Sequence, residues 1–386
     1  MNGPKIALIR QRYTDFGGAE RFVERALQGL ERQGAQVTLI TRRWDTDTSR
    51  DTLICNPFHL GRRRRDRNFA ACACRAAPEG AFDLVQSHER LVCCDLYRAG
   101  DGVHREWLHQ RARVLGPLGR LAQRFSPFHR QVLRAEKALF ESPRLKAVIC
   151  NSAMVRDEIL AHFAITAERL HIIHNGVDGQ AFSPQATKPL RATTRESLGL
   201  QPSHILLAFI GSGYRRKGLD AVLRALRALP DHYHLLIIGK DRRERRYRHD
   251  CDQDGLSGRC HFIGPRAEVL PYYAAADVFA QPTLYDPFPN VALEAMACAL
   301  PIITSRKSGA ADILRDGENG FVIDALDTTL LRQRLLELND PELRKCLGAA
   351  ARATVEPLTP EATTEALLEL YRKLLNGRRQ LMDAPV

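Results

Sequence analysis

The chain has 386 residues, of which 44% are hydrophobic and 26% charged, so it is long enough for two domains that each bury a core. This composition excludes a disordered or fibrous protein, and no apolar run reaches the roughly 20 residues that span a bilayer. The formal net charge of +12 favours an acidic partner, which composition leaves open between nucleic acid, an anionic membrane and a phosphorylated substrate. The first ten residues lack the apolar stretch of a signal peptide, so we expect a cytoplasmic protein.

Short apolar strands alternate with amphipathic helices in the first half of the chain. We expect strands at residues 6–9, 37–41, 53–55, 84–86 and 147–150. Between the first two, apolar residues recur at steps of three and four from Ala19 to Leu30, which predicts a helix with one apolar stripe. The alternation indicates βαβ units and a parallel sheet covered on both faces.

A second series of strands is expected at residues 205–210, 235–238, 261–263, 278–281, 302–304 and 321–323, with helices between most of them. Residues 185–201 are polar and flanked by prolines, and we interpret them as the passage between domains. The sequence thus predicts an α/β protein with two Rossmann-like domains, at about residues 1–180 and 181–358, that face each other across a ligand-binding cleft. The last segment, residues 359–386, contains an amphipathic helix that either closes the second domain or crosses back to the first.

Ten cysteines are present, and no two of them form a Cys-x-x-Cys pair. Some lie in apolar strand or helix patterns, as Cys150 and Cys298 do, and others are close together, as Cys72 and Cys74 are. For a cytoplasmic chain this pattern favours reduced, mostly buried thiols over disulfides or a zinc site.

Residues 211–220 form a glycine-rich turn that follows a strand and opens a helix. Glycines such as Gly211 let the backbone approach a ligand, and a helix N-terminus favours anions. Arg216 and Lys217 oppose the helix dipole there, so helix stability does not explain them, whereas a bound diphosphate would. An ordinary basic surface turn is the alternative, because glycine-rich loops are common.

Two carboxylates flank the next candidate segment. Asp286 lies in a loop after a strand, and Glu294 lies in an early turn of the helix that follows. Carboxylates near a phosphate site suit hydrogen bonding to sugar hydroxyls and stabilise a developing cationic sugar ring. The alternatives are a helix-start charge for Glu294 and a turn residue before proline for Asp286.

The first half contributes two weaker candidates. Gly17 and Gly18 follow the first strand and could present backbone N–H groups to a phosphate, with Glu20 close by, although a simple tight turn is the commoner meaning. Asp101 and His104 lie beside glycines in a loop and could serve a reacting hydroxyl, although a lone histidine in such a loop is more often merely exposed.

Taken in order, these segments resemble the retaining glycosyltransferases of family 4. The resemblance is carried by Gly17-Gly18, Asn151-Ser152, His174-Asn175-Gly176-Val177-Asp178, Arg216-Lys217-Gly218, and Asp286 placed ahead of Glu294-Ala295-Met296-Ala297 and Leu300-Pro301-Ile302-Ile303. It covers nearly the whole chain and implies a GT-B fold, a nucleoside-diphosphate sugar as donor substrate, front-face transfer with retention, and no cofactor.

The resemblance also implies roles for single residues. Catalytic roles fall to Asp101, Arg216, Lys217 and Asp286, and acceptor-side roles to Glu20, Asp101 and His104. Donor-binding roles fall to Gly17, Gly18, Gly211, Arg216, Lys217, Gly264, Asp286, Phe288, Asn290, Val291 and Glu294. The family usually has Glu where this chain has Asp286, which leaves the donor sugar open. No metal site is implied, and we interpret Asp250-Cys251-Asp252 as part of a solvated loop.

Residues 82–90 and 99–102 resemble the family members that add glucose from UDP-glucose to an inner-core heptose of lipopolysaccharide. That resemblance implies a peripheral enzyme on the cytoplasmic face of the inner membrane. The alternatives are a family 4 enzyme with another donor sugar or acceptor and, more distantly, a basic nucleic-acid-binding protein, for which no recognition motif is present.

A basic and apolar segment at about residues 104–134 fits the membrane expectation. Its seven arginines are interleaved with apolar residues and with a single acid, Glu106, a pattern typical of a surface that lies on anionic lipid. The expected membrane residues are Arg105, Trp107, Arg111, Arg113, Arg120, Arg124, Phe125, Phe128 and Arg130. A solvated helix face with a core-facing apolar stripe is the alternative. Arg62–Arg65 and Arg67 could add to this surface or contact phosphates of the acceptor.

Overall fold

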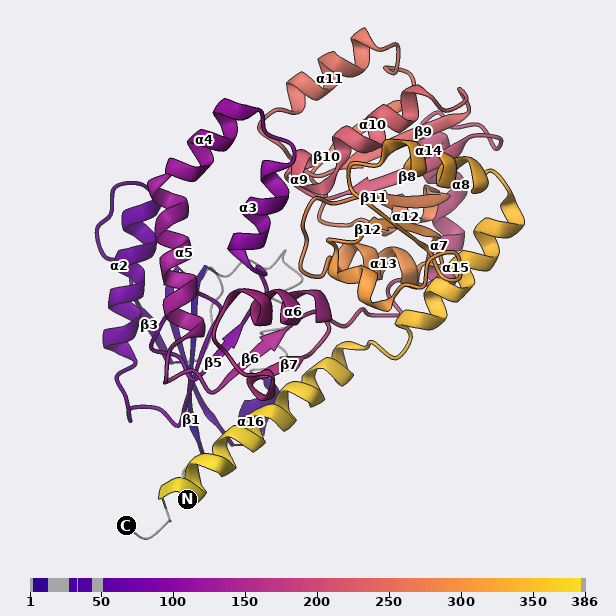
Figure 1. Ribbon diagram of the computed structural model, residues 1–386. Helices are drawn as coiled ribbons and strands as arrows, with labels where there is room; N and C mark the ends of the chain where they lie inside the picture. Colours follow the sequence, from indigo (N-terminus) through magenta and orange to yellow (C-terminus); the bar gives the residue numbers. More distant parts are fainter. Residues whose placement is uncertain (1–2, 13–27, 33, 44–50, 383–386) are drawn as a thin grey trace. The chain divides into compact units, whose positions relative to one another are not determined.

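The computed structural model describes residues 3–12, 28–32, 34–43 and 51–382, and the chain divides into two compact units (Figure 1). One unit comprises Met1–His174 with Glu361–Val386, and the other comprises Asn175–Pro360. The second unit begins earlier than predicted because Asn175 and Val177 bond within it, to Asn290 and Leu358 respectively.

The first unit is built on a parallel seven-stranded sheet in the order β3-β2-β1-β4-β5-β6-β7. Its strands are β1 Lys5–Arg12, β2 Gln36–Arg43, β3 Asp51–Ile54, β4 Leu84–Ser87, β5 Leu96–Arg98, β6 Ala147–Cys150 and β7 Leu170–Ile172. All five predicted strands are present. The two strands that the sequence did not indicate, β5 and β7, have three residues each, which is too short for a recognisable period.

The helices described in the first unit are α2 Gly61–Ala76, α3 His104–Ala112, α4 Pro117–Phe125, α5 Pro127–Phe140, α6 Ala153–His162 and the long α16 Pro360–Met382, with a 3₁₀ turn at Ala167–Arg169. Residues 28–32 are helical, as predicted, and the rest of that expected helix lies outside the described residues. Gly17, Gly18 and Glu20 lie outside them as well.

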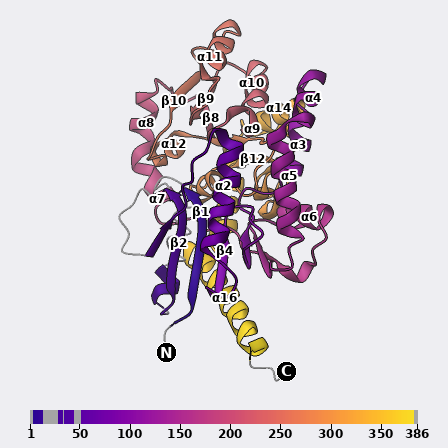
Figure 2. The ribbon, with the colours of Figure 1, turned by 90° about the vertical axis from the view of Figure 1, so that its left-hand side faces the viewer.

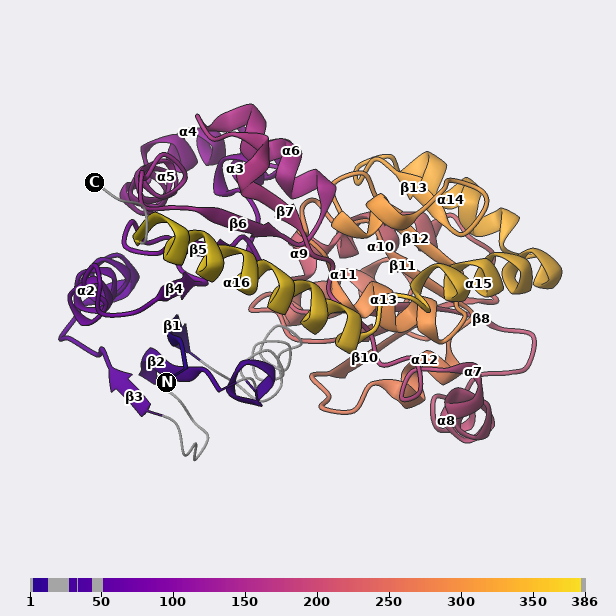
Figure 3. The ribbon, with the colours of Figure 1, turned by 90° about the horizontal axis from the view of Figure 1, so that it is seen from below.

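Helix α16 packs on the sheet of the first unit (Figure 3). Its buried Leu367, Leu370 and Tyr371 join a core cluster with strand residues such as Ile6 and Leu8. The Tyr371 hydroxyl donates a hydrogen bond to the side-chain oxygen of Gln86 on β4. The sequence left open whether this helix closes the second domain or crosses back to the first. In the structure it crosses back and packs on the first unit.

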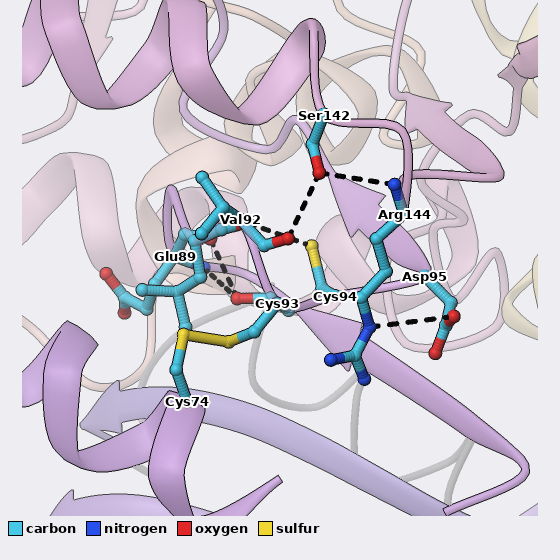
Figure 4. The surroundings of a disulfide bond; sticks show 10 residues. Cys74, Glu89, Val92, Cys93, Cys94, Asp95, Ser142 and Arg144 are labelled. Carbon is cyan, nitrogen blue, oxygen red and sulfur yellow. Dashed lines mark hydrogen bonds and ion pairs between the residues drawn. A yellow bond between two sulfur atoms is a disulfide. The ribbon is translucent and has the colours of Figure 1, made fainter. Parts of the chain in front are cut away.

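A disulfide joins Cys74, near the end of α2, to Cys93 in the connection between β4 and β5 (Figure 4). The prediction that all ten cysteines are reduced is wrong for this pair, whose Cα atoms lie 5.5 Å apart. The other eight cysteines are free thiols, and most are buried as expected. The pairing escaped sequence reasoning because residues 19 positions apart are brought together only when α2 packs beside that connection.

The second unit has a parallel six-stranded sheet in the order β10-β9-β8-β11-β12-β13 (Figures 1 and 3). Its strands are β8 Ile205–Ile210, β9 Tyr233–Ile238, β10 Cys260–Gly264, β11 Val278–Gln281, β12 Ile302–Ser305 and β13 Phe321–Ile323, so every predicted strand is present. Successive residues of β8 alternate between two core clusters, Leu207 and Phe209 in one and Leu206 and Ala208 in the other. The sheet is therefore covered on both faces, as its continuous apolar strands predict.

The helices of this unit are α7 Pro184–Thr187, α8 Arg191–Ser197, α9 Tyr214–Lys217, α10 Leu219–Arg227, α11 Glu244–Gln253, α12 Leu270–Ala275, α13 Asn290–Ala297, α14 Thr328–Glu337 and α15 Pro341–Val355, with 3₁₀ turns at Lys188–Leu190 and Gly309–Ile313. Two predictions are wrong here. The presumed passage at residues 185–201 is mostly helical and belongs to the unit, because Arg195 is buried and pairs with Asp277 at 3.0 Å. Asp250 and Asp252 lie on α11 rather than in a loop.

Candidate active site

Three glycines mark the carboxyl ends of β8, β9 and β10, the edge at which parallel sheets bind ligands. Gly211 follows β8, Gly239 follows β9, and Gly264 ends β10. A side chain on Gly239 would place its Cβ 2.3 Å from the Gly211 carbonyl oxygen, so only glycine fits there. The Gly239 amide also donates to the Gly264 carbonyl oxygen at 3.1 Å. Gly239 was not among the predicted site residues, although its place after a predicted strand was a signal.

The basic turn is joined to the loop that follows β11. Gly218 separates α9 from α10 with φ of +91°, and a Cβ at this position would lie 2.0 Å from the Pro282 carbonyl oxygen. The Arg216 carbonyl oxygen accepts hydrogen bonds from the Thr283 hydroxyl at 2.9 Å and the Leu284 amide at 2.8 Å. These contacts fix the backbone of Arg216 and Lys217 against the loop that carries Asp286.

Lys217 and Asp286 form a buried ion pair, with only 8% and 7% of each residue exposed. The Lys217 ammonium bonds one carboxylate oxygen of Asp286, and the Arg216 guanidinium lies 3.4 Å from the same oxygen. Arg216 also donates to the Tyr285 carbonyl oxygen at 3.1 Å. The structure thus brings together three of the predicted catalytic residues, from turns that follow two different strands.

The backbone of Asp286 is held by the loop that follows β12. Its amide donates to the Lys307 carbonyl oxygen at 2.9 Å, and its carbonyl oxygen accepts from the Gly309 amide at 2.8 Å. Ser308, between them, is fully buried, and its hydroxyl has no hydrogen-bond partner among the described residues. The backbone of Asp286 is therefore held on both sides. A residue that served only to form a turn before proline would not need these contacts.

The two cations keep Asp286 ionised. Burial raises the pKa of its carboxyl group, but the charges and hydrogen bonds of Lys217 and Arg216 lower it by more, so the pKa lies below its usual value. Burial in turn lowers the pKa of the Lys217 ammonium group, against the raising effect of Asp286. With one carboxylate facing two cations, the cluster carries excess positive charge at a glycine-lined strand edge, which suits a multivalent anion.

Glu294 projects from α13 and is held by a tyrosine that sequence reasoning missed. The hydroxyl of Tyr273, a buried residue on α12, donates to a Glu294 carboxylate oxygen at 2.9 Å. Burial and the neighbouring Glu294 charge raise the pKa of this tyrosine well above its usual value, so it remains a donor. No motif marked Tyr273 in the sequence, because its role depends on how α12 packs beside α13.

The loop between Asp286 and α13 holds the other predicted donor residues. Phe288 is buried in the core, so only its backbone is available to a ligand. The Asn290 side chain accepts a hydrogen bond from the Asn175 amide group at 2.7 Å, and Asn175 also donates to the Phe288 carbonyl oxygen at 3.4 Å. Val291 is half-buried at the start of the helix. Asn175 fixes this loop, and its place in the His-Asn-Gly motif was its sequence signal.

In the first unit, Asp101 is exposed in the turn that follows β5. The turn is fixed by Arg90, whose guanidinium donates to the Gly102 carbonyl oxygen at 3.1 Å and to Glu136 of α5 at 3.1 Å. Glu136 is fully buried and accepts a further bond from the His104 amide at 2.7 Å. Arg90 and Glu136 thus support the turn, and neither was predicted because their partners are distant in sequence.

His104 is not the exposed loop residue that its surroundings in the sequence suggested. It begins α3, and its ring bonds the ring of His129 at 3.1 Å, which in turn bonds Arg111 at 3.0 Å. Burial, with the charges of Arg90, His129 and Arg111, lowers the pKa of His104 to about 3. His104 is therefore neutral at physiological pH.

The predicted membrane segment folds into α3, α4 and α5. Arg105, Trp107 and Arg111 lie on α3, Arg113 follows it, Arg120, Arg124 and Phe125 lie on α4, and Phe128 and Arg130 lie on α5. Helix α4 has no buried residue, and its Leu118, Leu121 and Phe125 are 84%, 54% and 61% exposed. Phe128 instead packs against His104 and under the Arg62 guanidinium. Within the segment at residues 104–134, the large apolar side chains that are exposed therefore lie on α4.

Two absences hold within the described ranges of the chain. No group of three or more His, Cys, Asp or Glu side chains there is arranged to hold a metal ion. No helix there is long and apolar enough to cross a bilayer.

Comparison with known families matches both halves of the chain. The family model for Glycosyltransferase Family 4 matches residues 16–180, and the family model for Glycosyl transferases group 1 matches residues 191–354. The D-inositol 3-phosphate glycosyltransferase of Thermobifida fusca is 31% identical over 326 residues, covering 78% of this chain and 71% of that protein. Lipopolysaccharide glucosyltransferase WaaG of Escherichia coli is 26% identical over 325 residues, covering 82% and 84%.

Solved structures share the fold. The crystal structure of WaaG, a glycosyltransferase involved in lipopolysaccharide biosynthesis, superposes with a TM-score of 0.79 at 24% identity, over 93% of this chain and 98% of that one. Anabaena HepE in complex with UDP-glucose gives a TM-score of 0.70 at 19% identity, over 96% and 100%. The two parallel-sheet units, the order of the motifs and these relatives agree, and the chain belongs to the family 4 glycosyltransferases, transferases of the GT-B fold.

Proposed function

We propose that this enzyme transfers glucose from UDP-glucose to a heptose of the lipopolysaccharide inner core, with retention of configuration and without a metal or other cofactor. The observation that carries the donor part is the ion-pair cluster of Arg216, Lys217 and Asp286 at the strand edge of the second unit. The acceptor part is supported by the match to a relative named lipopolysaccharide glucosyltransferase.

In this proposal the cations of the cluster bind the donor diphosphate. Arg216 and Lys217 neutralise the charge that develops on the UDP leaving group, and the Gly211 backbone lets the diphosphate approach. Glu294, oriented by Tyr273, accepts hydrogen bonds from the ribose hydroxyls. Backbone groups of Phe288, Asn290 and Val291 line the sugar and phosphate, and the Gly264 backbone approaches the base.

Asp286 accepts hydrogen bonds from the sugar hydroxyls and, as a carboxylate, favours positive charge on the sugar ring. The bond from the anomeric carbon to the leaving phosphate breaks, and the acceptor oxygen bonds to the anomeric carbon from the same face. The acceptor proton passes to the departing phosphate oxygen, so charge stabilisation and orientation are what the protein must supply. In the first unit, Asp101 orients the acceptor hydroxyl, and the neutral His104 holds the turn beside it.

A second acceptor class has support of its own. The Thermobifida fusca relative is named for an inositol 3-phosphate acceptor and is 31% identical. A phosphorylated cyclitol or sugar is therefore the alternative acceptor, on the same donor chemistry.

Helix α4 supports attachment to an anionic bilayer at the cytoplasmic face of the inner membrane. Leu118, Leu121 and Phe125 are exposed apolar side chains, and Arg120 and Arg124 lie on the same helix. Burial of apolar side chains at the headgroup boundary together with arginine–lipid attraction stabilises such contacts.

The donor proposal is tested by measuring transfer with a panel of UDP- and GDP-sugars on heptose-terminated lipopolysaccharide and on inositol 3-phosphate. We expect UDP-glucose and the heptose acceptor to give the highest kcat/KM, with EDTA leaving the rate unchanged. Lys217→Ala should reduce the rate at least a hundredfold, whereas Lys345→Ala, on the exposed surface of α15, should not. Equal rates for the two variants would contradict the proposed site.

The membrane proposal is tested by vesicle co-sedimentation at low salt. We expect binding to phosphatidylglycerol vesicles and not to phosphatidylcholine vesicles. Phe125→Glu should abolish it, and Leu160→Glu, at an exposed apolar position of α6, is the matched control. Equal binding of the two variants would remove α4 from the contact.

A further inference from the structure

A groove runs between α2 and α5 of the first unit, which lie side by side (Figures 1 and 2). Its outer part is lined by Arg63 and Arg67 of α2 and by Arg130 and Arg134 of α5. Both helices begin at this end, because Arg62 lies over the ring of Phe128 at 5.5 Å from its centroid. The groove therefore gathers arginines from two helices: Arg63 and Arg130 lie in the first turns of α2 and α5, and Arg67 and Arg134 lie about one turn further along.

These four arginines form no ion pair among the described residues, and the acids of the groove, Asp66 and Glu89, line its inner part. In the part of the chain that the structure describes, none of them has a carboxylate within 4.0 Å, and the neighbouring Asp66 pairs with Arg65 at 2.8 Å. A solvated helix face would explain a row of arginines on one helix. It does not explain two helices that direct arginines into one concavity, where like charges repel each other. An occupant with several negative charges would offset that repulsion.

The outer part continues into an inner pocket that shares Arg67, Gln131 and Arg134 with it. The inner pocket has the apolar floor of Phe69 and Ala70.

Glu89 and Arg90 also line the inner pocket and are absent from the lining of the outer part. Glu89 accepts a hydrogen bond from the Gln11 amide at 3.0 Å, and burial, with the nearby Asp101 charge, raises its pKa. Arg90 bonds the Gly102 carbonyl oxygen at 3.1 Å. The inner end thus lies next to the turn that carries Asp101.

The walls of the groove are held in place. Arg63 and Gln131 form a reciprocal pair, in which the guanidinium donates to the amide oxygen at 3.1 Å and the amide nitrogen donates to the Arg63 carbonyl oxygen at 3.0 Å. The Cys74–Cys93 disulfide ties α2 to the connection that carries Glu89, as Figure 4 shows. A preformed site loses less entropy when a ligand binds than one that must first be ordered.

We propose that the α2–α5 groove is the acceptor subsite and that it takes a phosphate-bearing glycan. A phosphate group on the acceptor binds among Arg63, Arg67, Arg130 and Arg134, because guanidinium groups form paired hydrogen bonds with phosphate oxygens. A sugar ring lies over Phe69 and Ala70, and its hydroxyls reach Glu89, which directs the reacting end of the acceptor toward the turn of Asp101. This inference rests on the proposed glycosyltransferase function and adds the acceptor's phosphate to it.

The test measures binding of glucose 6-phosphate and of glucose as probes, by thermal shift and calorimetry, with UDP at saturation so that the donor site is occupied. We expect the phosphorylated sugar to bind wild type and the unphosphorylated sugar to bind at least tenfold more weakly. The double variant Arg67→Ala/Arg134→Ala should weaken the binding of glucose 6-phosphate at least tenfold. Arg75→Ala/Lys137→Ala removes the same charge from the same two helices outside the groove and should not change it.

Two measurements separate this proposal from its alternatives. UDP affinity should be unchanged in both double variants, so a loss of acceptor binding with intact UDP binding is specific to the groove. Binding to phosphatidylglycerol vesicles should fall equally in both. If only Arg67→Ala/Arg134→Ala lost vesicle binding, and it still bound glucose 6-phosphate like wild type, the arginines would form a lipid headgroup site and the proposal would be overturned.

Equal affinity for glucose and glucose 6-phosphate, or equal losses in the two double variants, would also overturn it. If Arg67→Ala/Arg134→Ala fails to fold, Arg67→Gln/Arg134→Gln keeps most of the side-chain length and replaces it in the same measurements.

Discussion

The ion pair between Lys217 and Asp286 offers the sharpest test of the site. Lys217→Met keeps the length of the side chain but removes its charge, and leaves Asp286 buried with only Arg216, 3.4 Å away. Loss of one partner of a buried pair costs about 3–5 kcal/mol, and the remaining arginine offsets part of this. We expect the free energy of unfolding to fall by about 2–3 kcal/mol.

The assay is urea unfolding followed by circular dichroism, on both single variants and on the double variant. Asp286→Asn alone leaves the Lys217 ammonium buried beside Arg216 and should also destabilise the fold. Lys217→Met/Asp286→Asn leaves no buried charge at either position, so its stability should return to within about 1 kcal/mol of wild type. Additive losses in the double variant would refute the buried pair.

Ligand binding separates the roles of the two residues. Lys217→Met should weaken UDP binding at least tenfold, because a cation is lost, whereas Asp286→Asn should not weaken it, because a competing carboxylate is lost. Acid provides a further check, since the pKa of Asp286 in the folded state lies below its usual 3.8. The stability that the pair contributes is present above that pH and is lost as the pH falls through the lower, folded-state value.

Three further predictions concern residues around the site and the sheet. Gly218→Ala should lower the melting temperature far more than Gly213→Ala, because a Cβ at position 218 meets a carbonyl oxygen at 2.0 Å and one at position 213 meets open space. Tyr273→Phe removes the hydrogen bond to Glu294 and should weaken UDP binding several-fold by calorimetry; unchanged affinity would show that Glu294 needs no positioning. Burial, with nearby histidines, lowers the pKa of His234 to about 4 from its usual 6.5, so stability should be full above pH 6.5 and fall as the pH approaches 4, and His234→Gln should flatten the change in melting temperature between pH 7 and 5.

The sequence by itself determined the parallel α/β architecture and much of the candidate donor site. Strands buried on both faces are continuous apolar runs, and all eleven predicted strands are present. The carboxyl ends of parallel strands share one edge of the sheet, so the sequence placed a basic turn after β8 and a carboxylate after β11 at the same edge, and the pairing of β8 with β11 in the structure brings them together. The charges of Arg216 and Lys217 oppose the helix dipole, and this marked them before any contact was known, whereas Asp286 was marked by its place after a strand and ahead of Glu294.

Only the tertiary structure decided where α16 packs, how Cys74 meets Cys93, and that Tyr273 holds Glu294. Each of these depends on two segments far apart in sequence whose separate patterns are unremarkable: an amphipathic helix fits either unit, and a buried tyrosine fits any core. The α2–α5 groove is of the same kind, because each helix alone shows only a basic face. Periodicity reports which face of an element is buried, but the partner that buries it is set by packing between elements.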